Sequence, residues 1–393
     1  MLFTLEALHA KHGDCLLLHF GKESAPSIMV IDGGPSGIYK GFLKPRLLEI
    51  KETLSPDAPL PLSMVMVSHL DDDHLNGILS LTEDAIEDNQ ESFGISNLWF
   101  NTFDDIIGNV QFPGVASTAS VSASSIRTPS YFEGVNDHAT AVIASTGQGR
   151  ELRNNAKKLA ATVNNPFEPI KTGQAALVRG DAGMPGIDWD GLSIQVIHPN
   201  GERLQELQEK WDKDLKQAKK AGDKSIIVAM LNDVDTSPFN LSSIVCLVTY
   251  KKKTILLTGD ARSDDIYAGL KTQKLLDKNG KLHVNLLKMP HHGSQRNLSD
   301  EFVEKITADN YVISADGNFD NPDDPTIEKI AEVNKKNSTV TLYLTNHDGK
   351  KGIKKRLDKI LARLKKEKNK MKIVFRDLEE PSIHINLLDK LEY

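Results

Sequence analysis

The sequence predicts an α/β protein built as a four-layer αββα sandwich. Apolar runs of strand length alternate with segments of helical spacing in two separate parts of the chain. Both parts share this strand-rich layout, which fits two sheets that face each other with helices covering the outside. The chain has 393 residues. At about 150 residues per domain, this length allows two or three domains, or one large domain with an insertion.

The N-terminal part of the chain reads as strand, turn, strand, strand, helix and strand. Residues 41–54 have helical spacing and predict a crossover helix. The run SMVMVSHL is continuously apolar before it ends in polar residues, which is typical of a strand covered on both faces. The strands are expected at residues 2–10, 15–20, 27–34 and 63–70.

The middle of the chain differs in amino-acid composition from both ends. Residues 81–190 are polar and predict an insertion or lid region with modest helices, and the Ser-, Thr- and Ala-rich stretch 115–130 predicts a mobile loop. The strand pattern resumes at residue 191. Strands are expected at 192–199, 244–250, 254–260, 284–290, 311–317 and 340–346, and helices at 203–222, 264–276, 299–306 and 326–336.

These patterns divide the chain into four parts. Residues 1–80 form the N-terminal half of the main domain, residues 81–190 are the insertion, and residues 191–349 form the C-terminal half. Residues 350–393 form a basic amphipathic helix and a terminal strand.

Composition excludes several classes of protein. The chain is 39% hydrophobic, 26% charged and 6% aromatic, which is ordinary for a globular enzyme and unlike a disordered, collagen-like or membrane protein. Its 2 cysteines, Cys15 and Cys246, lie in apolar runs, which excludes a disulfide scaffold and a cysteine-based zinc module. No signal-peptide pattern and no apolar run of membrane-spanning length is present. We therefore expect a cytoplasmic protein that does not enter a membrane.

The net charge of −6 conceals a strongly basic segment. Residues 350–372 hold 12 basic and 2 acidic side chains and so carry +10, which leaves −16 on the rest of the chain. The apolar residues of this segment share one helical face, which predicts an amphipathic helix docked on the fold. A surface that also binds nucleic-acid phosphates is the alternative interpretation. The apolar face consists of Ile353, Leu357, Ile360, Leu361 and Leu364.

The loop SHLDDDHLNG, directly after the apolar run at 63–70, contains side chains that commonly bind metals. His69, Asp71, Asp73 and His74 are spaced so that they can converge on two adjacent ions. Imidazole with carboxylate suits Zn²⁺, and Mn²⁺ or Fe also fits. The alternative is a polar loop whose side chains cap a helix and face solvent, and Asp72 is expected to do only that.

Further residues of this kind follow other strands. Asp260 ends the run TILLTGD, and His291 and His292 follow the run VNLLKMP. Asp32 ends the run SIMVIDGG and is expected to orient the ligand loop from behind. Ligand sites in α/β sheets collect beyond the carboxyl ends of strands, so we expect these residues at one sheet edge. Helix-capping or core histidines remain the alternative for His291 and His292.

Taken in order, Asp32, SHLDDDHLNG, LLTGDA and PHHGS resemble the metal-site motifs of the metallo-β-lactamase superfamily. Within it, they are similar to the branch that includes the hydrolase domain of the DNA-uptake competence proteins. The segments HGDCLLL, IDGG and NLSSIVCLV extend the resemblance. It covers residues 5–80 and 191–345 and implies the αββα fold together with a metal centre.

The resemblance also implies a role for each ligand. One or two Zn²⁺ ions, or Mn²⁺, are the implied cofactors, and Asp71 stands where the usual superfamily loop has its second histidine. His69 and Asp71 would bind one ion, Asp73, His74 and His292 would bind the second, and Asp260 would bridge the two.

Two features depart from the superfamily pattern. The histidine that elsewhere completes the first ion site has no clear equivalent. Asn240 and His198 are the candidates, although a histidine placed like His198 is more often structural, and a mononuclear centre is the alternative. Asn321 stands where relatives have a histidine before a proline. If that histidine protonates the leaving group in relatives, its loss here would lower activity or shift the role to His291, and a loop that only caps the following helix is the alternative. Ser294 and Asn321 are the candidate substrate-contacting residues.

We expect a metal-dependent hydrolase, specifically a phosphodiesterase or nuclease that uses a hydroxide generated on the metal. Asp73 or His291 would handle protons. The basic segment and the resemblance favour nucleic acid or another phosphodiester as substrate. Two alternatives stay open, because a fold does not fix a function: a catalytically weak metal-binding module of a multi-protein system, and a small-molecule acyl hydrolase.

Overall fold

The computed structural model describes residues 1–106, 137–169, 175–205, 209, 242–337, 339–349 and 352–393. The strands of the first half are β1 (Leu2–Leu8), β2 (Cys15–Lys22), β3 (Ala25–Gly33), β4 (Leu60–Leu62), β5 (Met64–Met66), β6 (Phe93–Ile95), β7 (Asn97–Trp99) and β8 (Thr162–Val163). Its helices are α1 (Lys44–Leu54), α2 (Asp72–Glu87), α3 (Phe103–Ile106) and α4 (Asp137–Lys158), and a π-helical turn, Tyr39–Leu43, precedes α1.

The second half continues with strands and helices in alternation. Its strands are β9 (Ile187–Trp189), β10 (Leu192–His198), β11 (Val245–Tyr250), β12 (Lys253–Leu257), β13 (Leu282–Lys288), β14 (Ile306–Ile313), β15 (Thr341–Leu344), β16 (Lys372–Phe375) and β17 (Ser382–Asn386). Its helices are α7 (Ser263–Thr272), α8 (Asp300–Lys305), α9 (Asp324–Val333) and α10 (Ile353–Lys366).

Two large sheets form the centre of the molecule. The first has the strand order β17-β1-β2-β3-β5-β7-β8, and the second has the order β16-β15-β14-β13-β12-β11-β10-β9. Strands β3, β5, β7 and β8 run parallel to one another, as do β12 to β16. The carboxyl ends of each parallel set therefore lie at one edge of its sheet.

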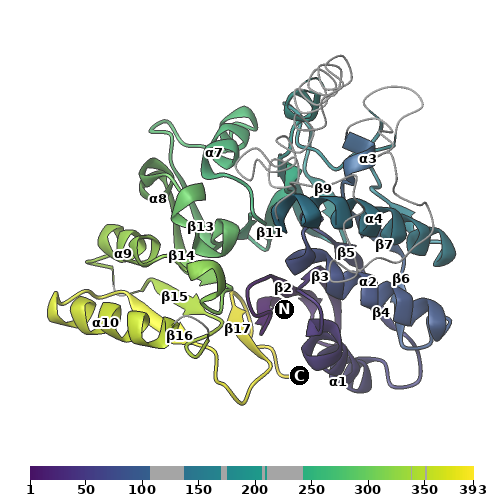
Figure 1. Cartoon of the computed structure of the whole chain (residues 1–393), viewed down its shortest axis with the longest axis horizontal. Helices are drawn as coiled ribbons and strands as arrows, with labels where there is room; N and C mark the ends of the chain where they lie inside the picture. Colours follow the sequence, from purple (N-terminus) through teal and green to yellow (C-terminus); the bar gives the residue numbers. More distant parts are fainter. Residues whose placement is uncertain (107–136, 170–174, 206–208, 210–241, 338, 350–351) are drawn as a thin grey trace.

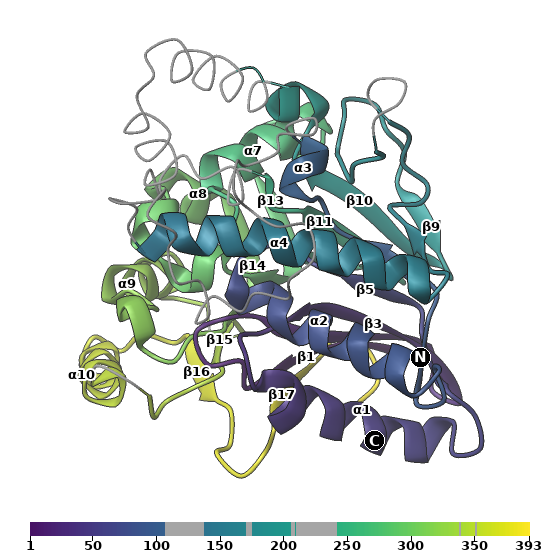
Figure 2. The same cartoon turned by 45° about the vertical axis from the view of Figure 1, so that its right-hand side comes forward.

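Three apolar clusters join the sheets and helices into four layers. Phe3, Trp99 and Val312 belong to the cluster that contains side chains of both sheets. A second cluster joins the first sheet to α1, α2 and α4, and a third joins the second sheet to α7, α8, α9 and α10. Figure 1 shows these two groups of helices on opposite sides of the strands, and Figure 2 shows α1, α2 and α4 side by side over the first sheet. The predicted αββα sandwich is confirmed.

Most of the expected strands and helices are present. The apolar runs at 2–10, 15–20, 27–34 and 63–70 form β1, β2, β3 and β5, and the predicted hairpin forms β11 and β12. The expected mobile loop at 115–130 and most of the expected helix at 203–222 lie outside the described residues.

The region expected as an insertion contributes to the first sheet. Residues 81–190 contain β7 and β8, which pair next to β5, and α4, whose Leu152 and Ala156 pack in the core under this sheet. The division of the chain into four parts therefore stays a prediction, and the middle part shares a core with the first.

The predicted amphipathic helix is confirmed as α10. Ile353, Leu357, Ile360 and Leu364 are buried against the second sheet, whereas Leu361 is only half-buried. Beyond α10 the chain returns to the first sheet, where β17 pairs antiparallel with β1. In the described part of the chain, no helix combines the length and apolarity needed to cross a membrane.

Candidate metal centre

The loop SHLDDDHLNG connects β5 to α2 and places its side chains at the start of the helix. Asp71 is the N-cap residue, and Asp72 and Asp73 occupy the first turn, where the helix dipole favours negative charge. The backbone N–H of His74 donates to the carbonyl oxygen of Asp71 over 2.9 Å. His69 and His74 are buried, so this turn directs two imidazoles into the protein.

The second sheet supplies its residues from the ends of β12 and β13. Asp260 follows β12 and is buried. After β13, His291, His292 and Gly293 have φ values of 46°, 54° and 80°. Consecutive residues of this left-handed region are costly for side chains other than glycine, and such strain is concentrated at functional sites. The ligand residues come from two sheets, because each half of the chain builds its own parallel set of strands. The expectation that all of them lie at one sheet edge is therefore wrong.

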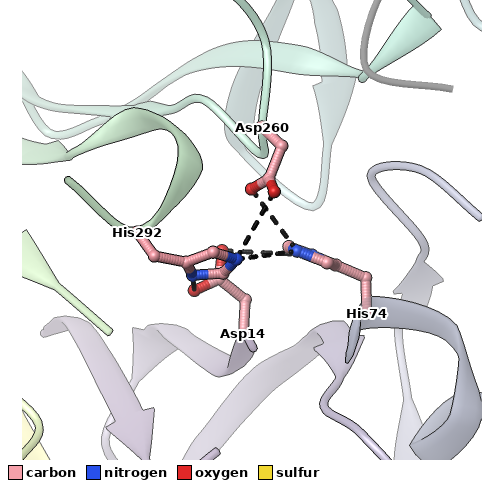
Figure 3. A group of neighbouring side chains, drawn as sticks. All are labelled: Asp14, His74, Asp260 and His292. Atoms are coloured by element: carbon pink, nitrogen blue, oxygen red, sulfur yellow. Dashed lines mark hydrogen bonds and ion pairs between the residues drawn. The ribbon is translucent and has the colours of Figure 1, made fainter. Parts of the chain in front are cut away.

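Four side chains converge at the centre of the site. The Nε2 atoms of His74 and His292 lie 3.3 Å apart. Asp260 Oδ1 lies 3.4 Å from Nε2 of His74, and its Oδ2 lies 3.4 Å from Nε2 of His292. Asp73 Oδ2 lies 3.3 Å from Nε2 of His292 and 3.8 Å from Nε2 of His74. Figure 3 shows the two rings pointing toward each other beneath Asp260.

These distances fit a bound metal ion. A tetrahedral ion bound at about 2.0 to 2.2 Å holds its ligand atoms about 3.3 to 3.6 Å apart. Four of the five distances lie in this range, and the fifth, between Asp73 and His74, is 3.8 Å. Two imidazole nitrogens and two carboxylates form a donor set that suits Zn²⁺ or Mn²⁺. The residues present therefore fit one divalent cation at this place.

Hydrogen bonds on the far side of each ring fix the orientation of the two histidines. Nδ1 of His74 lies 2.9 Å from Oδ2 of Asp32, and Nδ1 of His292 lies 3.0 Å from the carbonyl oxygen of Ser314. A carbonyl only accepts, so Nδ1 of His292 carries a proton, and the neutral form of this ring has its lone pair on Nε2. Metal-binding histidines are held in this way.

Asp32 occupies the position from which it can orient the loop. Its Oδ1 accepts from the backbone N–H of Ser68 over 2.7 Å, and its Oδ2 accepts from the Ser68 hydroxyl over 2.7 Å. Asp32 itself has a φ of 58°, a left-handed conformation that turns its carboxylate toward the loop. Its role as an orienting residue remains a proposal.

A second group of ligand atoms surrounds His69. Its Nε2 lies 3.6 Å from Asp71 Oδ2 and 3.8 Å from Asp260 Oδ2, and it has no hydrogen-bond partner although it is buried. A buried ring nitrogen without a partner is costly unless another group, such as a cation, satisfies it. His69, Asp73 and His74 also offer ligand atoms within 4.8 Å of one another. Asp260 lies between the two groups.

The electrostatics of the cluster favour positive charge. Burial lowers the pKa of His74, but the carboxylates of Asp260, Asp32 and Asp73 outweigh burial and hold this pKa well above its usual value. Burial raises the pKa of Asp260, but four histidines, His292 first among them, hold it well below its usual value. A divalent cation competes with protons for the same histidine nitrogens, so the cluster is suited to bind one or the other.

The remaining predicted residues lie around this centre. His291 Nε2 is 3.7 Å from Asp260 Oδ2, and its side chain is 25% exposed. Ser294 and Asn321 are buried in the turns after β13 and β14, where their backbone groups bond within their own loops. Asp72 is only partly buried, and burial raises its pKa.

The two candidates for an additional ligand do not join the described groups. His198 is buried in β10, where its Nδ1 lies 3.0 Å from the carbonyl oxygen of Ser243, and neither metal-binding group of the described residues contains it. Asn240 lies outside the described residues.

The structure adds two charged residues that the sequence patterns missed. Asp14 lies between β1 and β2 and joins His74, Asp260 and His292 in one group of possible ligand atoms. Lys288 ends β13, is 1% exposed and forms an ion pair with Asp14. Asp14 precedes a strand, so a prediction based on the polar residues that follow strands does not include it. A lysine inside the apolar run VNLLKMP was the available signal, because a fully buried lysine needs a partner.

No protein-family model matches this chain, and no curated protein matches its sequence. A structure of a proposed metal-dependent hydrolase from Parabacteroides distasonis is similar to it with a TM-score of 0.32 and 11% identity, over 96% of this chain and 100% of that protein. A mutant of the CmlA beta-hydroxylase is similar with a TM-score of 0.36 and 11% identity, and the match covers 98% of this chain but 54% of that protein. Likenesses this low say nothing of function, and the fold is defined by the chain's own sheets and helices.

Proposed function

We propose that this chain is a metal-dependent hydrolase of the metallo-β-lactamase superfamily that cleaves phosphodiesters. The observation that carries the proposal is the pair of buried imidazoles whose Nε2 atoms face each other at 3.3 Å between two carboxylates. When both rings are neutral and donate through Nδ1, the facing Nε2 atoms have no proton to share, and a cation would satisfy both lone pairs.

The residues divide between two ions. His74, His292, Asp73 and Asp260 would hold one ion at the centre of the cluster. His69 and Asp71, together with the second oxygen of Asp260, would hold the other. A bound divalent cation lowers the pKa of water into the neutral range and neutralises charge on a phosphoryl or acyl oxygen.

His291 is the residue best placed to move a proton. Burial lowers its pKa, so the neutral ring predominates at neutral pH. Its side chain is partly exposed, unlike those of His74 and His292, and it can therefore reach both the cluster and an entering substrate. Asp73 lies at ligand distance from His292, and the neighbouring histidines hold its pKa below the usual value in spite of burial, so it serves better as a ligand than as a proton carrier.

Charge supports a phosphodiester substrate over an acyl compound. Helix α10 has lysines that are exposed on its surface, and the basic segment 350–372 that contains it carries a charge of +10. Such a surface fits a polyanion. Nucleic acid is the phosphodiester that this charge favours, which leads to nuclease activity as the specific form of the proposal.

A catalytically weak interaction module is the second candidate function. The observation that favours it is Asn321, which is buried where the resemblance leads us to expect a histidine. In the described turn, the carbonyl oxygen of Asn321 accepts from the backbone N–H of Gly317, so the residue also has a local structural role. Metal would then stabilise the fold without supporting turnover.

Metal content and hydrolysis test the proposal together. Purified wild-type protein should contain about one to two equivalents of Zn²⁺ or Mn²⁺. His74→Ala and Asp73→Ala should lose bound metal and lower hydrolysis of bis(p-nitrophenyl) phosphate and nucleic acid by at least about a hundredfold. His198→Ala serves as a matched control because it removes a buried histidine outside both groups of ligand atoms.

The outcomes separate the candidate functions. Cleavage at the wild-type rate by both alanine variants would rule out the assigned site. Metal binding with no turnover of any diester or acyl substrate, under any divalent cation, would favour the interaction module. Turnover of thioesters or lactones alone would favour an acyl hydrolase.

A further inference from the structure

A buried ion pair lies behind the candidate metal ligands. Asp14 and Lys288 are each 1% exposed, and the Nζ atom of Lys288 contacts Oδ2 of Asp14. Asp14 Oδ1 lies 3.6 Å from Nδ1 of His292, and its Oδ2 lies 4.0 Å from Nδ1 of His74. These nitrogens are on the opposite side of each ring from the Nε2 atoms that face Asp260. Asp14 therefore approaches both imidazoles from behind, as Figure 3 shows for His292.

The loop that carries Asp14 is joined to both sides of the cluster. The backbone N–H of Asp14 donates to the carbonyl oxygen of Asp73 over 3.2 Å. A Cβ atom on Gly13 would lie 1.9 Å from that same oxygen, so only glycine permits this approach. The Ser314 hydroxyl donates to the carbonyl oxygen of Gly13 over 2.6 Å, and the Ser314 carbonyl oxygen accepts from His292. The loop thus links the ligand turn of the first sheet to that of the second.

The two charges compensate each other inside the protein. Burial lowers the pKa of Lys288, but Asp14 and Asp260 outweigh burial and raise it, so the ammonium group stays charged. The contact between Nζ of Lys288 and Oδ2 of Asp14 places the two opposite charges together where both side chains are buried. Removing one partner would leave an uncompensated buried charge beside the metal ligands.

We propose that Asp14 and Lys288 act as a positioning pair for the metal centre. Asp14 supports the rings of His292 and His74 from their Nδ1 sides, and Lys288 anchors Asp14 and cancels its charge toward the bound cation. The inference rests on the proposed metal centre and assigns two positioning residues to it, neither of which is a ligand. It predicts opposite effects for the two single substitutions, because one leaves a positive charge near the cation and the other leaves a negative charge.

The pair is tested by removing metal from the whole chain and measuring its Mn²⁺ affinity by calorimetric titration. Asp14→Asn should weaken Mn²⁺ binding about 10- to 100-fold, the range found when residues behind metal ligands are replaced. Lys288→Met should bind Mn²⁺ as tightly as wild type or more tightly. The combined variant should bind more tightly than Asp14→Asn and at least about tenfold more weakly than Lys288→Met.

Glu6→Gln is the matched control for stability. It also converts a buried, ion-paired carboxylate into an amide, but it lies outside the metal-binding groups of the described residues. It should lower the unfolding temperature and leave Mn²⁺ affinity unchanged. If Asp14→Asn does not fold, the combined variant and Lys288→Met still differ only at Asp14 and give the same comparison.

Three results would overturn the inference. These are wild-type affinity in Asp14→Asn, equal weakening by both single substitutions without recovery in the combined variant, and equal affinity of the combined variant and Lys288→Met. The second result would mean that the pair only stabilises the fold. Failure of the wild-type chain itself to bind Mn²⁺ or Zn²⁺ would instead reject the metal centre, so the two failures can be told apart.

Discussion

The protonation state of the buried residue Glu6 is set by the polar and charged side chains beside it. Glu6 is fully buried, yet Arg46 Nε donates to its Oε1 over 2.7 Å, and the Ser382 hydroxyl donates to the same oxygen over 2.6 Å. Nε2 of His19 lies 2.9 Å from its Oε2. Burial raises the pKa of Glu6, but His19, His384 and Arg46 outweigh burial and hold it well below its usual value. This carboxylate therefore stays charged in the core.

The depressed pKa of Glu6 predicts a pH-dependent stability. Its contribution is fully present above the pKa of an unfolded glutamate, about 4.3, and is lost as the pH falls through the lower folded-state value. Glu6→Gln should lower the free energy of unfolding at pH 7 by about 3 to 5 kcal/mol, because it removes the buried one of the two carboxylates that pair with Arg46. The variant should also lose stability less steeply than wild type below about pH 4.

Urea unfolding across this pH range measures both effects. Glu49→Gln is a matched control, because Glu49 bonds to the same guanidinium over 2.8 Å but its side chain is 64% exposed. It should cost less than about 1 kcal/mol at any pH. Identical pH slopes in wild type and Glu6→Gln would contradict the assignment of this carboxylate.

At the scale of elements, the position of α2 decides where its ligands lie. Helix α2 carries Asp73 and His74 in its first turn and packs against the end of β3. The two backbones meet at a pair of glycines: a Cβ atom on Gly77 would lie 1.9 Å from the carbonyl oxygen of Gly33. The close approach of helix and strand therefore depends on the absence of a side chain at this point.

Gly77→Ala should displace α2 from β3. We expect a loss of about 1 to 3 kcal/mol in the free energy of unfolding, typical of overpacking, together with weaker Mn²⁺ binding because His74 moves with the helix. Gly147→Ala in α4 is the control, because a Cβ atom there meets nothing within 4 Å and alanine favours a helix. Chemical denaturation and calorimetric Mn²⁺ titration of both variants check the prediction. It would be wrong if Gly77→Ala behaved like Gly147→Ala.

At the scale of the whole molecule, charge is distributed unevenly between a basic segment and an acidic remainder. Helix α10 buries its apolar face against the second sheet and exposes Lys359, Lys365 and Lys366. Arg356 and Arg363 of the same helix bond instead to Asp324 and Glu328 of α9. The arginines thus help to dock the helix, whereas the three lysines are the side chains that would contact the proposed nucleic acid.

Replacing Lys359, Lys365 and Lys366 together by serine should weaken binding of single-stranded nucleic acid and reduce its salt dependence. Each phosphate that a lysine no longer neutralises should lower the slope of log affinity against log salt by about 0.7. Hydrolysis of bis(p-nitrophenyl) phosphate should stay at the wild-type rate, because the small diester needs only the metal centre. Fluorescence titration at several salt concentrations measures the slope.

A variant with the same change of charge elsewhere controls this experiment. Lys22, Lys271 and Lys278 are exposed outside the basic segment, and their replacement by serine should leave the salt slope unchanged. Equal slopes in wild type and the α10 variant would exclude α10 as the nucleic-acid surface. Such a result would leave a small diester or an acyl compound as the substrate class.

Local patterns predicted much of the fold because strands and helices follow from short-range periodicity. The continuous apolar run before His69 indicated a strand covered on both faces, and the helical spacing of Ile353, Leu357 and Ile360 indicated one buried helix face. The same patterns did not show that β7 and β8 extend the first sheet, because strands of three and two residues carry too little periodicity to stand out.

The sequence by itself determined the αββα class and the residue types available to a metal, since those depend on neighbours along the chain. Only the tertiary structure decided which atoms meet. His74 and His292 are separated by 218 positions, and they face each other because two sheets built by different halves of the chain pack with their strand ends together. The same packing buries Asp14 against Lys288. No local pattern reports such a pair, because the free energy that selects it comes from charges brought together across the core.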